Sequence, residues 1–317
     1  HRRRQSRKSR RRYTKLGGIQ VKILVTGADG FIGSYLVPEL QQAKHEVIPT
    51  VKKNGDLVLP STMASLLSTH RPDVVVHLAA KTSRLLCEDD PRDTVFQNTV
   101  ATLNVALACK QFGAKLVYAS TSEVYGHHGD VLLHEGSPTK PTGIYGLTKL
   151  WGEQAAQLHA PDRLLILRLG MPYGPFQSPA GFSPVGRGRA AIVNFLYQAL
   201  HRQPIPVHVG SERSLCYVTD TVRAIRMLID NACEGIWNVG RDDATVPMRE
   251  LAEVACMMTE APPSLIQDVP APERQVIVKR LSMQKLLSIG WRPEIATHDG
   301  MRRVLEWVKT LPGPDSQ

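Results

Sequence analysis

The sequence lacks the features that mark membrane-spanning, disulfide-rich and zinc-binding proteins. No apolar run approaches the roughly 20 residues that a bilayer-spanning helix needs. The cysteines are odd in number and scattered, and none belongs to a CxxC pair: Cys87, Cys109, Cys216, Cys233 and Cys256. This spacing argues against a disulfide framework or a metal site, and it favours a reducing, cytoplasmic environment.

Acidic residues are lacking from the first 15 residues, HRRRQSRKSRRRYTK, which contain nine lysines and arginines. The net charge of the whole chain is +10, so the remainder is close to neutral. Such a run is typical of a disordered, solvated tail, which we assign to residues 1–18. The tail could contact RNA, DNA or anionic lipid without specificity, and an Arg-rich, acid-poor start also permits a transit peptide. For the rest of the chain, neither nucleic acid nor a membrane is expected as a partner.

The 317 residues are 42% hydrophobic and 21% charged, as in soluble globular proteins. From residue 19, short apolar strands alternate with helices of 10 to 20 residues. Strands are expected over 19–26, 45–50, 73–78, 115–118 and 163–167. This alternation predicts an α/β fold with a Rossmann-type, doubly wound parallel sheet.

Beyond Arg168 the chain becomes rich in proline, glycine and loops. We therefore divide it into a dinucleotide-binding domain over 19–170 and a smaller C-terminal α/β domain, mainly for substrate binding, over 171–317. Residues 215–245 are expected to return to the first domain.

Three glycines at a spacing of three, Gly27, Gly30 and Gly33, follow the first strand and open the first helix. In a dinucleotide-binding turn, the first allows the tight turn and the second lets the backbone approach a pyrophosphate. The third lets the helix pack on the sheet, and the helix N-terminus offers N–H groups to the phosphates. A lone triplet is weak evidence, but its position between a strand and a helix favours dinucleotide binding.

The second strand does not decide between NAD and NADP. NAD-binding proteins usually carry an acidic residue at its end to hold the ribose 2′-hydroxyl, and strand 45–50 has none there. Lys52 and Lys53 follow and could hold a 2′-phosphate, which leans slightly to NADP, although two surface lysines facing water explain them equally well. Asp56 and Leu57 offer a carboxylate and an apolar contact to the adenine end.

Tyr145 and Lys149 are four residues apart in a predicted helix, so both side chains lie on one face. A tyrosine with a pKa of about 10 is a poor base, and a nearby ammonium group lowers that pKa. The pair predicts a proton shuttle for a hydroxyl that becomes a carbonyl while a hydride leaves.

Together with these signals, several further segments resemble the extended short-chain dehydrogenase/reductase family. That family contains the epimerases, dehydratases, decarboxylases and ketoreductases of nucleotide sugars. The segments are TGADGFIG (26–33), DVVVHLAA (73–80), ASTSEVYG (119–126), YGLTK (145–149), RLGMPYGP (168–175), GSERSLCYVTD (210–220), GIWNVG (235–240) and KRLSMQKLLSIGWRP (279–293). The resemblance covers nearly everything from residue 20 onward. It implies that the polar end of strand 115–118 forms the floor of an active site.

The resemblance also implies site residues and partners. It implies that Thr121 hydrogen-bonds the reacting sugar hydroxyl, that Tyr145 is the acid/base and that Lys149 binds the nicotinamide ribose. Ser122 and Glu123 are expected to be catalytic residues beside them. The cofactor is expected to contact Gly27, Gly30, Phe31, Ile32, Gly33, Lys52, Asp56, Leu57, Ala79, Ala80, Lys81, Asn98, Ser120, Tyr145 and Lys149. The substrate, a nucleotide-diphosphate sugar, is expected to contact Met171, Arg189, Asn194, Val207 and Arg213. Arg213 matches the arginine that binds the diphosphate, Val207 matches the nucleobase contact, and the family resemblance suggests a homodimer.

Glu123 is the most informative variable position. In sugar 4,6-dehydratases a glutamate at this position removes the C5 proton once C4 is a ketone, and plain 4-epimerases usually lack it. The alternative is that Glu123 caps the loop or pairs with a nearby lysine.

Two departures bear on the reaction. Met171 replaces an asparagine of the family, and only residues 51–72 separate the second strand from the third, as in deoxysugar 4-ketoreductases that use NADPH. We expect a nucleotide-sugar epimerase or dehydratase that oxidises C4 transiently, with NAD or NADP. The alternatives are an NADPH-dependent 4-ketoreductase, a UDP-glucuronate decarboxylase-like enzyme, and a dinucleotide-sensing binding protein whose Arg-rich tail contacts RNA.

Overall fold

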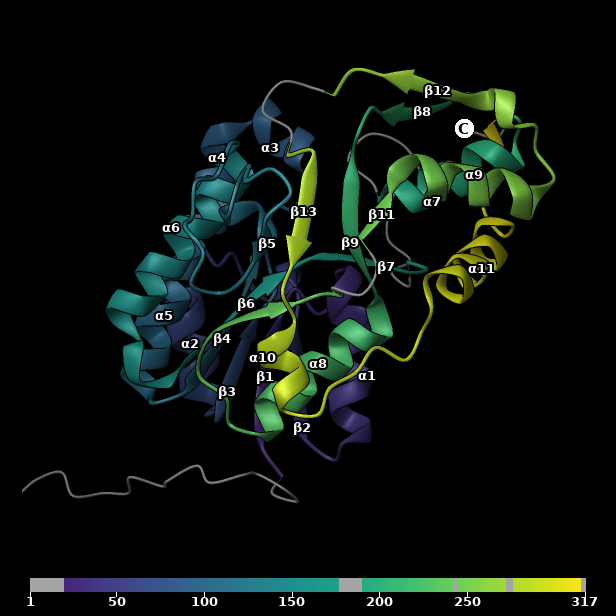
Figure 1. Ribbon diagram of the computed structural model, residues 1–317. Helices are drawn as coiled ribbons and strands as arrows, with labels where there is room; N and C mark the ends of the chain where they lie inside the picture. Colours follow the sequence, from purple (N-terminus) through teal and green to yellow (C-terminus); the bar gives the residue numbers. More distant parts are fainter. Residues whose placement is uncertain (1–19, 177–189, 242–244, 272–275, 315–317) are drawn as a thin grey trace, which may run out of the picture.

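The computed structural model describes residues 20–176, 190–241, 245–271 and 276–314 (Figure 1). The predicted basic tail over residues 1–18 and the predicted substrate contact Arg189 lie outside the described residues. Within those ranges, no helix combines the length and apolar character needed to cross a bilayer. The five cysteines carry free thiols.

A parallel sheet of six strands forms the centre of the larger part of the molecule. Its order is β2-β1-β3-β4-β6-β10. The strands are β1 (Lys22–Thr26), β2 (Glu46–Thr50), β3 (Val74–His77), β4 (Lys115–Thr121), β6 (Leu164–Leu169) and β10 (Gly235–Val239). The predicted Rossmann-type sheet is confirmed. Strand β2 lies on one side of β1 and β3 on the other, so the direction in which strands are added reverses at β1. Ligands bind at such a switch point, beyond the carboxyl ends of the strands.

Both faces of the sheet are covered because successive strand residues point to opposite sides. Val25, Val76 and Val117 pack toward helices on one face, whereas Leu24 and Val75 pack toward helices on the other. The first face is covered by α1 (Phe31–Gln42) and α8 (Val218–Asp230). The second is covered by α2 (Pro60–His70), α5 (Ala101–Phe112) and α6 (Ile144–His159). Burial on both faces explains why these strands read as continuous apolar runs.

The connection from β2 to β3 is compact. It contains a 3₁₀ turn, η1 (Lys52–Asn54), followed directly by α2. Strand β2 forms one edge of the sheet and pairs with β1.

The helical stretch over 91–112 contains a wider turn. It divides into α4 (Pro91–Val95), a π-helical segment η2 (Phe96–Val100) and α5. Such π-bulges are frequent at functional sites, and this one carries the buried Asn98.

The smaller part has its own sheets and its own core. One sheet joins β11 (Thr245–Pro247), β9 (Glu212–Tyr217), β13 (Val278–Leu281) and β5 (Leu132–Leu133), with β7 (Met171–Tyr173) beside β9. A second pairs β8 (Ile205–His208) with β12 (Ile266–Val269). Helices α7 (Ala191–Leu200), α9 (Met248–Thr259) and α11 (Thr297–Val308) pack around one apolar core with β8 and β9 (Figure 1).

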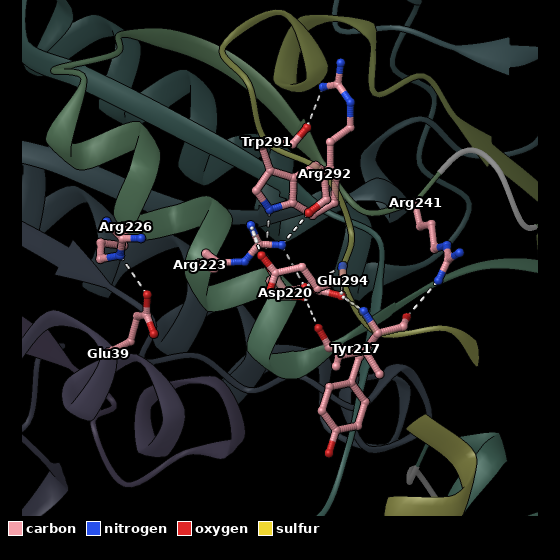
Figure 2. A network of polar contacts seen from close by, with 11 residues as sticks. Glu39, Tyr217, Asp220, Arg223, Arg226, Arg241, Trp291, Arg292 and Glu294 are labelled. Carbon is pink, nitrogen blue, oxygen red and sulfur yellow. Dashed lines mark hydrogen bonds and ion pairs between the residues drawn. The ribbon is translucent and has the colours of Figure 1, made fainter. Parts of the chain in front are cut away.

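A polar network ties α8 to the C-terminal segment that follows α10 (Gln284–Ser288) (Figure 2). The buried Asp220 carboxylate accepts hydrogen bonds from the backbone N–H groups of Glu294 and Ile295, at 3.0 Å each. Arg223 donates to the same carboxylate at 2.9 Å and pairs with Glu294 at 3.0 Å. The indole N–H of Trp291 donates to the Asp220 carbonyl at 3.2 Å. The chain is therefore anchored to α8 just before it enters α11.

Candidate active site

A cleft of about 1600 Å³ lies at the carboxyl ends of the central strands, between the large sheet and the smaller part. Residues that follow β1, β3, β4 and β6 line one side of it, and residues of β9, β13 and α7 line the other. The position agrees with the rule that open α/β sheets bind ligands at the switch point.

The glycine-rich loop forms the floor of the cleft beyond β1. Gly27 adopts φ +66°, and a Cβ there would lie 2.8 Å from the Ala79 nitrogen. A Cβ on Gly33 would clash with the Gly27 carbonyl and lie 2.7 Å from the Ala28 Cα. Both positions therefore exclude a side chain for steric reasons, and the loop leaves room for a group to approach its backbone.

Most residues predicted to contact a dinucleotide line this cleft. They are Gly27, Gly30, Phe31, Ile32, Gly33, Lys52, Asp56, Leu57, Ala79, Ala80, Lys81, Ser120, Tyr145 and Lys149. Lys52 is exposed at the rim and reaches the cleft, whereas its neighbour Lys53 does not line it.

Asn98 has a different place from the one predicted. It is 1% exposed and does not line the cleft. Its side chain accepts a hydrogen bond from the Lys81 N–H at 2.8 Å and donates to the Lys81 carbonyl at 3.0 Å and to Thr148 at 3.2 Å. Asn98 thus holds the loop after β3 against α6, one layer behind the cleft.

Thr121 and Tyr145 meet at the end of β4. The Thr121 hydroxyl lies near the Tyr145 phenol and acts to lower its pKa, which favours the phenolate. Burial nevertheless raises the pKa of Tyr145 above its usual value, and the Glu123 carboxylate raises it further. The net shift in the pKa of Tyr145 is therefore upward, because desolvation outweighs the favourable effect of Thr121. The lowering of this pKa by Lys149 stays a prediction.

Lys149 lies one turn farther along α6 and is 3% exposed. Its ammonium group lies 4.5 Å from the centre of the Tyr118 ring. Burial lowers the pKa of Lys149 to about 7, while the carboxylate of Glu153 opposes that shift. Lys149 is therefore able to gain or lose a proton near neutral pH.

A buried ion pair joins β6 to α6, the helix that carries Tyr145 and Lys149. Arg168 on β6 donates two hydrogen bonds to Glu153 on α6, at 3.0 and 2.7 Å, and both side chains are at most 5% exposed. Glu153 also accepts a hydrogen bond from the Ser120 hydroxyl. Ser120 therefore connects β4 to this pair and fixes the strand against the helix that carries Tyr145.

Glu123 forms an ion pair with Lys279 of β13, which lies 156 residues away in the sequence. The Lys279 side chain is 9% exposed and that of Glu123 is 24% exposed. Burial alone would raise the pKa of Glu123, but the charges of Lys279, Arg213 and Arg84 lower it below the usual value. Glu123 thus pairs with a lysine, as the alternative interpretation of this residue expects. Glu123 also lines the cleft beside Thr121 and Ser122.

The predicted substrate contacts divide into two groups. Met171, Asn194 and Arg213 line the cleft. Val207 does not line it, and its side chain is buried in the core of the smaller part. Because neighbouring strand residues point to opposite sides, Pro206 and His208 of β8 face the cleft instead.

Two cleft cations were not predicted as site residues, Lys279 and Arg84. Lys279 lies within the KRLSMQKLLSIGWRP segment, but its pairing depends on β13 joining β9. Arg84 opens the short helix α3 (Arg84–Asp89), and a single arginine in a polar loop carries no sequence pattern of its own.

Comparisons with known proteins agree with this geometry. The model of the NAD dependent epimerase/dehydratase family matches residues 23–240. UDP-glucuronic acid decarboxylase 6 of Arabidopsis thaliana is 28% identical, over 92% of this chain and 89% of the relative. The dTDP-D-glucose 4,6-dehydratase of Homo sapiens is 25% identical, over 92% and 91%. The crystal structure of the UDP-glucose 4-epimerase of Thermus thermophilus in complex with NAD matches with a TM-score of 0.82 and 26% identity, over 91% of this chain and 99% of that one.

Proposed function

The chain belongs to the NAD dependent epimerase/dehydratase family, and on that premise we propose that it oxidises C4 of a nucleotide-diphosphate sugar transiently, to epimerise or dehydrate the sugar. The observation that carries the proposal is the meeting of Thr121, Tyr145 and Lys149 in the same cleft as the glycine-rich loop. Membership of a family of enzymes also sets aside the non-catalytic alternative.

The cleft suits a dinucleotide because Gly27, Gly30 and Gly33 line it at the start of α1, where the helix N-terminus offers N–H groups to a pyrophosphate. A bound NAD or NADP supplies the hydride acceptor. Tyr145 exchanges a proton with the C4 hydroxyl, and Thr121, which lines the cleft beside Tyr145, orients that hydroxyl. Lys149, with its pKa lowered to about 7, holds the ribose and provides a nearby proton acceptor at neutral pH.

Glu123 is the base that we propose for a dehydratase. Its lowered pKa keeps it ionised at neutral pH, and it lies two residues beyond Thr121 in the cleft. Once C4 is a ketone, the C5 proton is acidified and a carboxylate can remove it.

The C5 position therefore distinguishes the reactions. A dehydratase should incorporate deuterium at C5 in deuterated water, and Glu123→Gln should abolish that exchange while reduced cofactor accumulates. An epimerase should invert C4 with no deuterium at C5, and the same variant should remain active. NMR of the product and absorbance at the reduced nicotinamide band give both readings.

An NADPH-dependent 4-ketoreductase is the second candidate. It is favoured by the compact connection after β2 and by Lys52, whose ammonium group lines the cleft next to Asp56 and Leu57 and suits a 2′-phosphate. Such an enzyme would consume one added NADPH in every turnover. A uronic acid decarboxylase is the third, and it would release carbon dioxide after C4 oxidation.

The decisive first experiment is to identify the small molecules that co-purify with the protein, by mass spectrometry, and to incubate it with UDP, GDP and dTDP sugars. Conversion of a nucleotide sugar with NAD, NADP or NADPH supports the proposal. Failure to bind or convert any of them would refute it.

We also propose a homodimer formed through α5 and α6. Leu107, Trp151 and Leu158 are 43%, 38% and 73% exposed on these two neighbouring helices. Light scattering should give twice the chain mass, and Leu158→Glu with Trp151→Glu should reduce it to that of one chain. A single-chain mass for the wild type would contradict the dimer.

A further inference from the structure

The substrate end of the cleft carries an excess of positive charge. Arg84, Arg213 and Lys279 all line it, and their charges act on one carboxylate, that of Glu123. Among the described residues, no other acidic side chain is near enough to raise the pKa of Arg213 or of Lys279. Burial lowers the pKa of each of those two groups, and the charge of Arg84 lowers it further. Three cations therefore share one anion, Glu123, and a second anion bound in the cleft would reduce the repulsion among them.

Two of the three cations have an evident partner or task. Lys279 pairs with Glu123. Arg213 donates to the carbonyls of Glu212 and Ile277, and its position in the cleft suits the diphosphate that any nucleotide sugar carries. For Arg84, no carboxylate within the described part of the chain forms an ion pair, although the side chain is only partly exposed.

Arg84 is held at the reacting end of the cleft. It begins α3, which is capped by Ser83 and packs against α6, the helix of Tyr145 and Lys149. The Glu88 carboxylate of α3 accepts a hydrogen bond from the Ile144 N–H, the first residue of α6, at 2.8 Å. Arg84 lines the same cleft as Glu123 and Lys279, and it is near enough for its charge to act on both of those side chains.

We propose that Arg84 recognises a carboxylate on the sugar, so that the substrate of this cleft is a nucleotide-diphosphate uronic acid rather than a neutral sugar. The inference rests on the proposed function, which it makes more specific. A guanidinium binds a carboxylate through two parallel hydrogen bonds, and such charge-assisted pairs are stronger than neutral ones. A neutral sugar would leave Arg84 without a partner in a cleft that already holds two other cations.

The test compares ligands that differ by this one group. Binding of UDP, UDP-glucose and UDP-glucuronate is measured by calorimetry with saturating NADH or NADPH, and the guanosine and thymidine counterparts are run in parallel. The protein is the full chain, as wild type, Arg84→Met and Arg84→Lys. Arg92→Met is the matched control, since Arg92 is exposed on the neighbouring α4 and lies outside the cleft. Thermal unfolding confirms that each variant is folded.

We expect the wild type to bind the uronic acid more tightly than the neutral sugar, by roughly 10- to 100-fold for one charge-assisted contact. Arg84→Met should remove that preference and leave the affinity for UDP and for the neutral sugar within about threefold. Arg84→Lys should retain part of the preference, and Arg92→Met should match the wild type.

Two results would overturn the inference while the proposed function stands. One is a wild type that binds the neutral sugar as tightly as the uronic acid. The other is an equal loss for UDP, neutral sugar and uronic acid in Arg84→Met, which would assign Arg84 to the diphosphate. If no nucleotide or nucleotide sugar binds to the wild type, the proposed function itself fails.

Discussion

The pairing of Glu123 with Lys279 predicts an asymmetric response to mutation. The charge of Glu123 raises the pKa of both Lys279 and Arg213, and the charge of Arg84 acts in turn on Glu123. Glu123→Gln removes the shared anion and leaves three cations facing one another. Lys279→Met removes one cation, relieves its repulsion with the other two, and leaves Glu123 still facing both arginines. We therefore expect Glu123→Gln to be the more destabilising substitution.

The magnitudes follow from burial. Breaking a buried ion pair from one side typically costs about 3–5 kcal/mol, and both side chains are less than one-quarter exposed. Glu123→Gln should lower the free energy of unfolding by an amount in that range. For Lys279→Met the remaining arginines compensate, and we expect about 1–2 kcal/mol. Lys309→Met is the control: Lys309 and Glu306 form an exposed pair at 2.8 Å, and such pairs contribute about 0–1 kcal/mol.

Urea unfolding at neutral pH measures all three variants, and repetition in acid adds a second test. Because the folded protein lowers the pKa of Glu123, this carboxylate stabilises the fold above its unfolded pKa of about 4.3. That contribution is lost as the pH falls through the lower, folded pKa. The gap between wild type and Glu123→Gln should therefore narrow below about pH 4. A cost for Lys279→Met equal to or above that of Glu123→Gln would refute this account of the charges.

Three further predictions concern the cleft. Tyr145→Phe should reduce turnover by about 10²–10⁴ with little change in cofactor affinity by fluorescence titration, and near-normal turnover would exclude Tyr145 as the proton shuttle. The folded state lowers the pKa of the buried Lys149 to about 7. Above that pH the unfolded chain binds one more proton than the folded chain, so the contribution of Lys149 to the free energy of unfolding rises by about 1.4 kcal/mol per pH unit toward pH 10. Urea unfolding of Lys149→Met should show a smaller rise between pH 7.5 and 9.5 than the wild type, and parallel slopes would contradict the shifted pKa. Gly33→Ala should weaken cofactor binding and cost about 1–3 kcal/mol of stability because its Cβ would lie 2.7 Å from the Ala28 Cα, whereas Gly313→Ala, with its nearest neighbour at 3.7 Å, should change neither.

The central sheet and its first binding loop could be predicted from the sequence because their signals are local. Each buried strand is a short apolar run, and the glycine spacing depends on residues that are adjacent in the chain. The pair that we propose as catalytic could also be predicted, since a spacing of four residues on a helix places Tyr145 and Lys149 on one face. Its electrostatics were not, because the pKa of Tyr145 depends on how deeply it is buried among distant segments.

The remaining features of the site depend on long-range packing. Lys279 reaches Glu123 only because β13 pairs with β9 and β5. The sequence predicts that Val207 contacts the substrate, but its neighbours Pro206 and His208 line the cleft and Val207 lies in the core. In a strand, an offset of one residue moves the side chain to the opposite face. Asn98 is close to the cleft but acts through the backbone of Lys81, and a buried asparagine gives no sequence sign of whether it contacts a ligand or a loop.

The return of the chain to the large sheet determines how this protein can be divided. Helix α8 and strand β10 lie in the sequence between two stretches of the smaller part, one ending with β9 and the other beginning with β11. Yet β10 forms the edge of the central sheet beside β6, and α8 covers one of its faces. A fragment ending near residue 170 would lack both, and it would expose the apolar side chains of β1, β3 and β4 that α8 helps to cover. The glycine-rich loop and helix α6 are thus encoded in the first half of the chain, but the sheet that holds them is completed by the second half. To transfer substrate specificity between relatives by recombination, the stretches before residue 218 and after residue 239 must therefore be replaced separately. Residues 218–239 must stay with the six-stranded sheet to which they belong.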